Sequence, residues 1–401
     1  MQYLRDALLG ILPILFCIQF LGWLTFFPNA LRGHADFRQL YVAGYMVRTG
    51  HRTRLYDYKL QTHLQNTLVS NDELALPFIR PAYQALLFLP LSFFSYRTAY
   101  LVFLSVNVLL LGLTFRLLQP RMQNLSRAWR GLPPALFLTF YPIALALMQG
   151  QDSIVLAALL AGTLISLERD REFAAGALIG LGLFKFQIVI PIALLFLLWR
   201  RWRFATGFAL SAVLVCLLSF VTIGRAETVV FLRSLLSVGA GLPAPVGQIS
   251  FPLRVTIMAN LRGLVYGLGS SRLRGLPLQI VIVLLSALVL LWVWVRAREQ
   301  RRGGNALFLA IPASVIVSYY LFIHDLSVLL IPIVLTLDAS MSLDVAGKQS
   351  GPATAAMSAL LFVAPMCVFG IPGYFYVVSL PICAFLLMMT QNVHEAKSNG
   401  T

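Results

Sequence analysis

Long apolar runs recur along almost the whole chain and are separated by mostly short polar connections. Several runs reach the roughly 18–20 residues that an α-helix needs to cross a hydrocarbon core about 30 Å thick. The pattern predicts an all-α polytopic membrane protein with a single transmembrane domain over residues 1–401. Its twelve predicted spans are 7–27, 97–118, 132–149, 153–167, 173–184, 188–199, 204–222, 277–295, 305–322, 326–338, 353–370 and 374–390.

Composition supports this class. Hydrophobic residues make up 59% of the chain and charged residues 11%, whereas a soluble domain has roughly 45–50% and about 25%. The first apolar run is too long for a signal-peptide core and has no small-residue cleavage site after it, so it is predicted to be an uncleaved span. All four cysteines fall inside apolar runs, which indicates small buried side chains rather than a disulfide framework.

The net charge of +16 does not indicate a nucleic-acid partner, because the arginines gather in alternate short connections between spans. Such clusters mark the cytoplasmic side of a membrane protein. The predicted inner residues are Arg116, Arg121, Arg127, Arg130, Arg169, Arg171, Arg200, Arg201, Arg203, Arg296, Arg298, Arg301, Arg302 and Lys348. The short outer connections hold one basic residue, Lys185. We therefore expect a plasma (inner) membrane protein with both termini, including the tail 391–401, in the cytoplasm.

Two regions depart from regular full-length spans. Residues 81–94 are too few to cross a membrane and are predicted to be re-entrant or interfacial. Residues 173–184 and 188–199 would each reach only about 18 Å as helices. Read as two short helices they meet at Lys185, below the outer surface, where non-helical backbone is tolerated only in contact with protein or water. The spacing predicts an outward-facing cavity with Lys185 in its wall.

Two longer segments, 28–82 and 223–276, fall on the outer side. In the first, residues 36–49 and 56–69 have the apolar spacing of amphipathic helices, which we expect at the membrane interface. The second contains a Gly- and Pro-bearing patch at 241–247, predicted to be flexible. Neither segment is predicted to form an independent domain.

Ionisable and polar groups collect on this outer side. Each has a local structural explanation: an N-cap for the first aspartate, a headgroup contact for the lysine, and a solvated turn for the others. Their shared side predicts a functional cavity. The residues are Asp36, Gln151, Asp152, Lys185, His324 and Asp325.

Such a cavity suits transfer of a sugar from a lipid phosphate. The acceptor hydroxyl needs a base, and the departing phosphate needs cationic or polar donors. Four residues can serve as the base, and the residues alone do not rank them: Asp36, Asp152, Asp325 and His324. The candidate phosphate-binding residues are Lys185, Arg254 and Gln151, and Tyr41 and Gln248 are further cavity candidates. Because no D-x-D motif in a soluble domain and no His/Cys cluster with ligand spacing occurs, no metal is expected.

The order of several short motifs resembles glycosyltransferase family 87, the polyprenyl-phosphate-dependent, mannosyltransferase-like proteins of the GT-C fold. The motifs are Asp36-Phe37 with Tyr41, Ala43, Gly50 and Leu55-Tyr56-Asp57; Pro81 with 86–90; Gly150-Gln151; Gly176 and Gly180 leading to Lys185; Gln248 with Ser250; and His324-Asp325-Leu326. Departures from the family pattern are Arg80 before Pro81, Phe186 after Lys185, and Ser153.

The resemblance implies a GT-C-like bundle and a hexosyltransferase, with mannose as one sugar. It implies a polyprenyl-phosphate donor, a lipid or glycan acceptor, no cofactor, and a site facing the periplasm or exterior. It also implies Asp36 as the essential carboxylate and His324 as a second catalytic residue. The alternative class is a secondary transporter or lipid flippase, because broken helices near mid-membrane are typical of transporters as well. A third reading is a membrane scaffold without catalysis.

Overall fold

The computed structural model describes residues 2–71, 74–240, 255–269, 275–297, 305–341 and 352–398, and all regular structure in these ranges is helical. The helices are α1 (Gln2–Asn29), α2 (Phe37–Arg48), α3 (Tyr58–Leu68), α4 (Ala82–Phe88), α5 (Tyr96–Leu118), α6 (Gln123–Ala128), α7 (Leu132–Thr139), α8 (Tyr141–Met148), α9 (Ser153–Glu168), α10 (Glu172–Leu181), α11 (Phe186–Leu198), α12 (Trp202–Ala240), α13 (Leu261–Gly269), α14 (Leu276–Arg296), α15 (Asn305–Val317), α16 (Leu330–Ser340), α17 (Pro352–Val363) and α18 (Ser379–Ser398).

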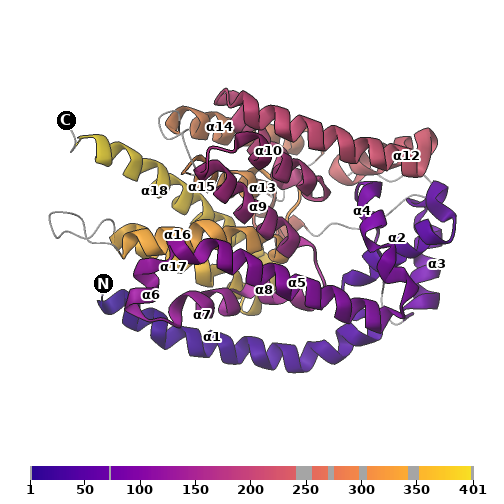
Figure 1. The fold of residues 1–401 in the computed structure, drawn as a ribbon, viewed down its shortest axis with the longest axis horizontal. Coiled ribbons are helices and arrows are strands. Elements are labelled where there is room, and N and C mark those ends of the chain that lie inside the picture. Colours follow the sequence, from indigo (N-terminus) through magenta and orange to yellow (C-terminus); the bar gives the residue numbers. More distant parts are fainter. Residues whose placement is uncertain are drawn as a thin grey trace.

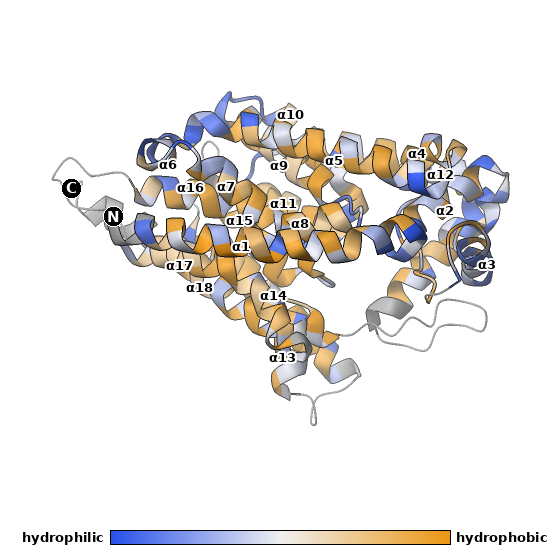
Figure 2. Ribbon diagram, turned by 90° about the horizontal axis from the view of Figure 1, so that it is seen from below, coloured by the Kyte–Doolittle hydropathy of each residue, from blue (hydrophilic) through white to orange (hydrophobic). Residues whose placement is uncertain are grey.

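The molecule is elongated, and its long helices run along its length (Figure 1). The N-terminus and α6 lie at one end, and α2, α3 and α4 lie at the other. A broad apolar band separates two more hydrophilic ends (Figure 2), as expected for a bundle that crosses a bilayer. Large apolar side chains such as Leu109 on α5, Val221 on α12 and Val283 on α14 are exposed, as expected where lipid is the solvent.

Eight segments of the described chain are long and apolar enough to cross a membrane. The structure therefore shows a polytopic helical protein, whereas the predicted count of twelve stays a prediction. The difference comes from short and broken helices. The run 132–149 is interrupted at Phe140 between α7 and α8, and α9 and α15 have only 16 and 13 residues. In addition, Glu172–Leu198 is one of the eight segments, whereas the sequence predicted two spans there.

That segment is folded back on itself. Glu172 at the start of α10 forms an ion pair with Arg201, just after α11, with a nitrogen–oxygen distance of 2.5 Å. The ends of α10 and α11 therefore lie side by side, and the helices meet at the 3₁₀ turn Gly182–Lys185. On α10, Gly176 and Gly180 let it pack against α12 so closely that a Cβ at Gly176 would lie 1.9 Å from the Phe204 carbonyl oxygen.

The described helix ends that border the basic connections gather at one end of the bundle. Four sets of side-chain contacts join them: Arg121 with Glu168, Glu172 with Arg201, Trp199 with Trp294, and Asn124 with Asp338. The predicted grouping of the Arg-rich loops on a single side thus has a direct counterpart in the packing. The site described below lies away from this end.

The opposite end is formed by the first segment predicted to lie outside, residues 28–82, where the two expected helices are α2 and α3. Much of α2 is buried: Phe37, Leu40, Val42 and Met46 are at most 1% exposed, so α2 is a packed core helix rather than a helix with one apolar face. Residues 81–94 form the short α4 and a 3₁₀ turn, Pro90–Phe93, and their re-entrant or interfacial position stays a prediction.

The second outer segment differs from the prediction at its start. Residues 225–240 were expected in a loop but continue α12 beyond a break at Gly224, where φ is +76°. The extension is held by tertiary contacts: the Glu227 carboxylate accepts a hydrogen bond from the Tyr56 amide at 2.7 Å, and Phe231 stacks on the Tyr56 ring. The predicted flexible patch 241–247 lies outside the described residues.

Candidate active site

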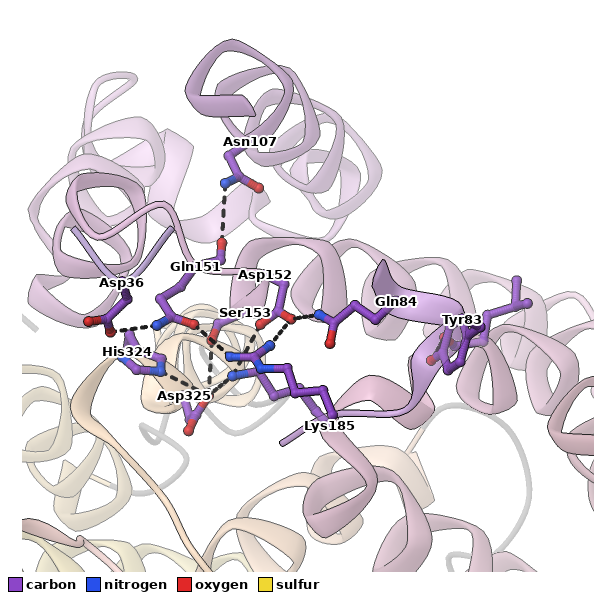
Figure 3. Close-up of polar contacts among 12 residues, drawn as sticks. Asp36, Tyr83, Gln84, Asn107, Gln151, Asp152, Ser153, Lys185, His324 and Asp325 are labelled. Atoms are coloured by element: carbon purple, nitrogen blue, oxygen red, sulfur yellow. Dashed lines mark hydrogen bonds and ion pairs between the residues drawn. The ribbon is translucent and has the colours of Figure 1, made fainter. Parts of the chain in front are cut away.

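The polar residues predicted on the outer side come together in the folded chain (Figure 3). Each is carried by a helix start or a turn between short helices. Asp36 precedes α2, Gln151 and Asp152 form the turn between α8 and α9, and Lys185 ends the turn between α10 and α11. His324 and Asp325 lie in the 3₁₀ helix Ile323–Leu329 before α16. These helices are short because their ends meet inside the bundle rather than at its surface.

The turn at residues 149–152 is attached to the start of α2. Gly150 has φ of +58°, a conformation that favours glycine, and a Cβ there would lie 2.8 Å from Cβ of Phe37. The Gln149 side-chain oxygen accepts from the Asp36 amide, and its backbone oxygen accepts from the Phe37 amide, both at 3.0 Å. The backbone of Asp36 is thereby fixed relative to Gln151 and Asp152.

The Lys185 ammonium lies at the centre of the network. Its Nζ is 2.7 Å from Oδ1 of Asp325 and 3.1 Å from Oδ1 of Asp152, and all three side chains are at most 3% exposed. Asp325 also accepts from the Ser153 hydroxyl and from the Phe322 amide, each at 3.0 Å. A buried ammonium held by two carboxylates joins α9, α10, α11 and the Ile323–Leu329 turn.

Arg80 is a member of the network that the sequence did not indicate as a site residue. Its guanidinium forms an ion pair with Asp152 and donates to the Gln151 side-chain oxygen at 3.2 Å. Gln84 also donates to Asp152, and Asn107 donates to the Gln151 backbone oxygen. The only signal in the sequence was the departure from the family pattern at Arg80, where a charged residue directly precedes an apolar run.

Arg80 and Lys185 both lie beside the buried Asp152 carboxylate and compensate its negative charge. Its two positively charged neighbours leave it poorly suited to accept a proton.

Asp36 differs from the two other carboxylates. It is partly exposed, and its Oδ2 accepts from Gln151 Nε2 at 2.6 Å. Within the described residues no cation pairs with it. It stands at the N-cap position of α2 but makes no side-chain capping bond, whereas Asp57 caps α3 by accepting from the Leu60 amide. The capping explanation of Asp36 therefore has no support in its contacts.

His324 lies between the two kinds of carboxylate. Its Nε2 is 3.5 Å from Oδ1 of Asp325, and its ring stacks on Phe322 with centroids 5.7 Å apart. Its side chain also lies near the Asp36 carboxylate, as Figure 3 shows, and the two groups interact electrostatically. The described network thus holds three carboxylates, two cations and one imidazole.

Of the other predicted residues, Tyr41 is not part of this network. The Tyr41 hydroxyl donates to the Phe94 backbone oxygen at 2.9 Å, and its ring packs on Phe37 and Tyr96. Arg254 and Gln248 lie outside the described residues. Lys185, predicted as a phosphate-binding residue, has two carboxylate partners in the structure. Within the described chain no group of three or more His, Cys, Asp or Glu residues could hold a metal ion.

The fold and this network define a multi-pass helical membrane protein with a buried charged centre where short helices meet. The family model for glycosyltransferase family 87 matches residues 78–323, more than half of the chain. The chain belongs to that family and is a membrane glycosyltransferase, which confirms the resemblance seen in its motifs. No curated protein and no solved structure matches it. The matched range includes Arg80, Asp152 and Lys185, whereas Asp36 and His324 lie outside it.

Proposed function

We propose that this glycosyltransferase moves a hexose from a polyprenyl-phosphate donor to a hydroxyl of a lipid or glycan acceptor. The observation that carries the proposal is the contrast among the three carboxylates. Asp152 and Asp325 are buried in ion pairs, whereas Asp36 is partly exposed and bonded to a neutral amide. An unpaired, accessible carboxylate is the group best suited to take a proton from an acceptor hydroxyl.

In the proposed step the acceptor oxygen attacks the anomeric carbon and its proton passes to Asp36. The bond between the anomeric carbon and the phosphate oxygen breaks, and its electron pair leaves with the phosphate. Gln151 fixes one Asp36 oxygen, so the other is left to face the acceptor. His324, near Asp36, is the second proposed catalytic group. The phosphate is proposed to bind the outer-segment arginines, including Arg254, because Lys185 and Arg80 are held by carboxylates.

The donor class has a direct test. Sugar transfer by purified protein is expected with a polyprenyl-phosphate hexose and is expected to survive EDTA, because cationic side chains rather than a metal stabilise the leaving phosphate. The measurement is transfer of radiolabelled sugar, with EDTA-treated and untreated samples side by side. Transfer from a nucleotide sugar in membranes free of polyprenyl phosphate would contradict the proposal, and loss of activity in EDTA would contradict its metal-free chemistry.

The site is proposed to open to the periplasm or cell exterior, and the basic end of the bundle to lie in the cytoplasm. In a chain with its cysteines replaced by alanine, an impermeant maleimide added to intact cells should label Asn66→Cys on α3 and miss Arg130→Cys. Both side chains are exposed in the fold, so permeabilised cells should label both and serve as the control. The opposite pattern in intact cells would place the site in the cytoplasm.

A further inference from the structure

A row of aromatic side chains leads away from His324. Phe322 stacks on the His324 ring, the Tyr320 ring lies 6.3 Å from Phe322, and the Phe186 ring lies 6.1 Å from Tyr320, measured between centroids. Phe186 directly follows Lys185, so the row runs from one member of the charged network to the neighbour of another. This row is not used in the proton transfer proposed above.

Both rings lie in a segment without regular helix, residues 318–322, which connects α15 to the Ile323–Leu329 turn. Their ring centroids lie 6.3 Å apart, so the two side chains are neighbours. Tyr320 and Phe322 are both partly exposed, whereas Leu321 between them is fully buried. The segment therefore presents two aromatic rings on its open side.

The face is not purely apolar. Tyr320 carries a hydroxyl, and its ring lies between Phe186, which follows Lys185, and Phe322, which stacks on His324. A ring that offers an apolar face and a hydroxyl at its edge suits a ligand with both apolar and hydroxyl-bearing surfaces. A pyranose has this character: C–H bonds on its faces and hydroxyls around its rim. An isoprenoid chain would gain nothing from the phenol or from the nearby charges.

We propose that Tyr320 and Phe322 form a stacking platform for a pyranose ring beside His324 and Asp36. This inference rests on the proposed function, since it places a sugar at the reacting groups. The ring belongs either to the donor or to the acceptor, and the two sources share the same chemistry. The platform orients the sugar and takes no part in proton transfer.

The test compares Phe322→Leu and Tyr320→Leu with the wild-type enzyme. Stacking of this kind is worth up to about tenfold in affinity. The KM for one substrate should rise by about three- to tenfold, with kcat within about threefold. Separate titrations of donor and acceptor identify which substrate carries the platform's sugar. Phe115→Leu is the matched control: Phe115 is also partly exposed but packs on Phe137, in α5 and α7, and its substitution should leave both KM values unchanged.

A second readout needs no turnover. Saturation-transfer NMR with a methyl hexoside, which has neither phosphate nor isoprenoid, should show sugar contacts in the wild type and the Phe115→Leu control that are lost in both platform variants. This experiment separates the proposed sugar transfer from the proposed platform. Sugar contacts in a protein that transfers no sugar would contradict the transfer reaction but support the platform. Unchanged KM values with unchanged NMR contacts would overturn the platform. So would KM changes that follow isoprenoid length, since the face would then hold the lipid.

Discussion

Asp36→Asn is expected to lower the rate of sugar transfer by roughly 10²–10⁴-fold, the usual contribution of a general base, while the protein folds normally. Asparagine keeps a side-chain oxygen that can accept from Gln151 but has no basic lone pair for the acceptor proton. Because Asp36 makes no capping bond to α2, helix stability should not change. The measurement is transfer from a radiolabelled lipid-phosphate sugar by purified protein at matched concentration.

Asp57→Asn is the matched control, since it makes the same substitution in the same outer segment. Asp57 caps α3 and pairs with Arg54 in an exposed contact. Asparagine caps a helix about as well as aspartate, so activity should stay near wild type. If Asp36→Asn retained more than about a tenth of the activity, Asp36 could not be the base, and His324 would be the next candidate to test by His324→Ala.

Lys185→Met is expected to destabilise the fold by about 3–5 kcal/mol, the usual cost of removing one partner from a buried ion pair. It leaves Asp325 and Asp152 charged, with their nearest shared cation gone. Adding Asp325→Asn should recover much of the loss, because the second change removes the uncompensated charge. Thermal unfolding and the monodisperse fraction on size exclusion, measured for both single variants and the double variant, give the coupling between the two residues.

The comparison pair is Arg54 and Asp57, whose side chains are 58% and 29% exposed. Arg54→Met should change stability by no more than about 1 kcal/mol, as is usual for a surface pair. Should Lys185→Met unfold like the wild type yet lose activity, the lysine would be a substrate-binding residue, as first predicted from the sequence, rather than a structural one.

Much of the site could be predicted because its members lie at turns whose side of the membrane follows from arginine distribution. Charge alone grouped Asp36, Asp152, Lys185 and Asp325. The charge pattern could not show which carboxylate lacks a cation partner, because the ion pairs form between distant residues. Lys185 and Asp325, for example, are 140 positions apart. For the same reason, the two carboxylate partners of Lys185 could not be predicted.

The errors in the fold have equally local causes. The extension of α12 was missed because Gly224, Arg225 and Glu227 interrupt its apolar pattern, and the contacts that hold it come from Tyr56 in the first outer segment. Arg80 was missed because it lies just before α4, a helix of seven residues that is too short to show an apolar pattern with a buried side. Its guanidinium is held by Asp152 and Gln151, which lie more than 70 residues away.

The fold-back of α10 and α11 also sets the depth of the reaction. α10 has 10 residues and the following turn has 4. Together they extend about 15 Å plus 8 Å along the helix axis, which is less than the hydrocarbon core of about 30 Å. In the transfer proposed above, the acceptor alcohol therefore enters below the headgroups, where bulk water is scarce. A sugar transferase has to transfer its sugar to an alcohol rather than to water, which is far more concentrated. Under the proposed function, helix length contributes to that selectivity: one added turn in each helix would raise the centre by about 5 Å toward the aqueous phase.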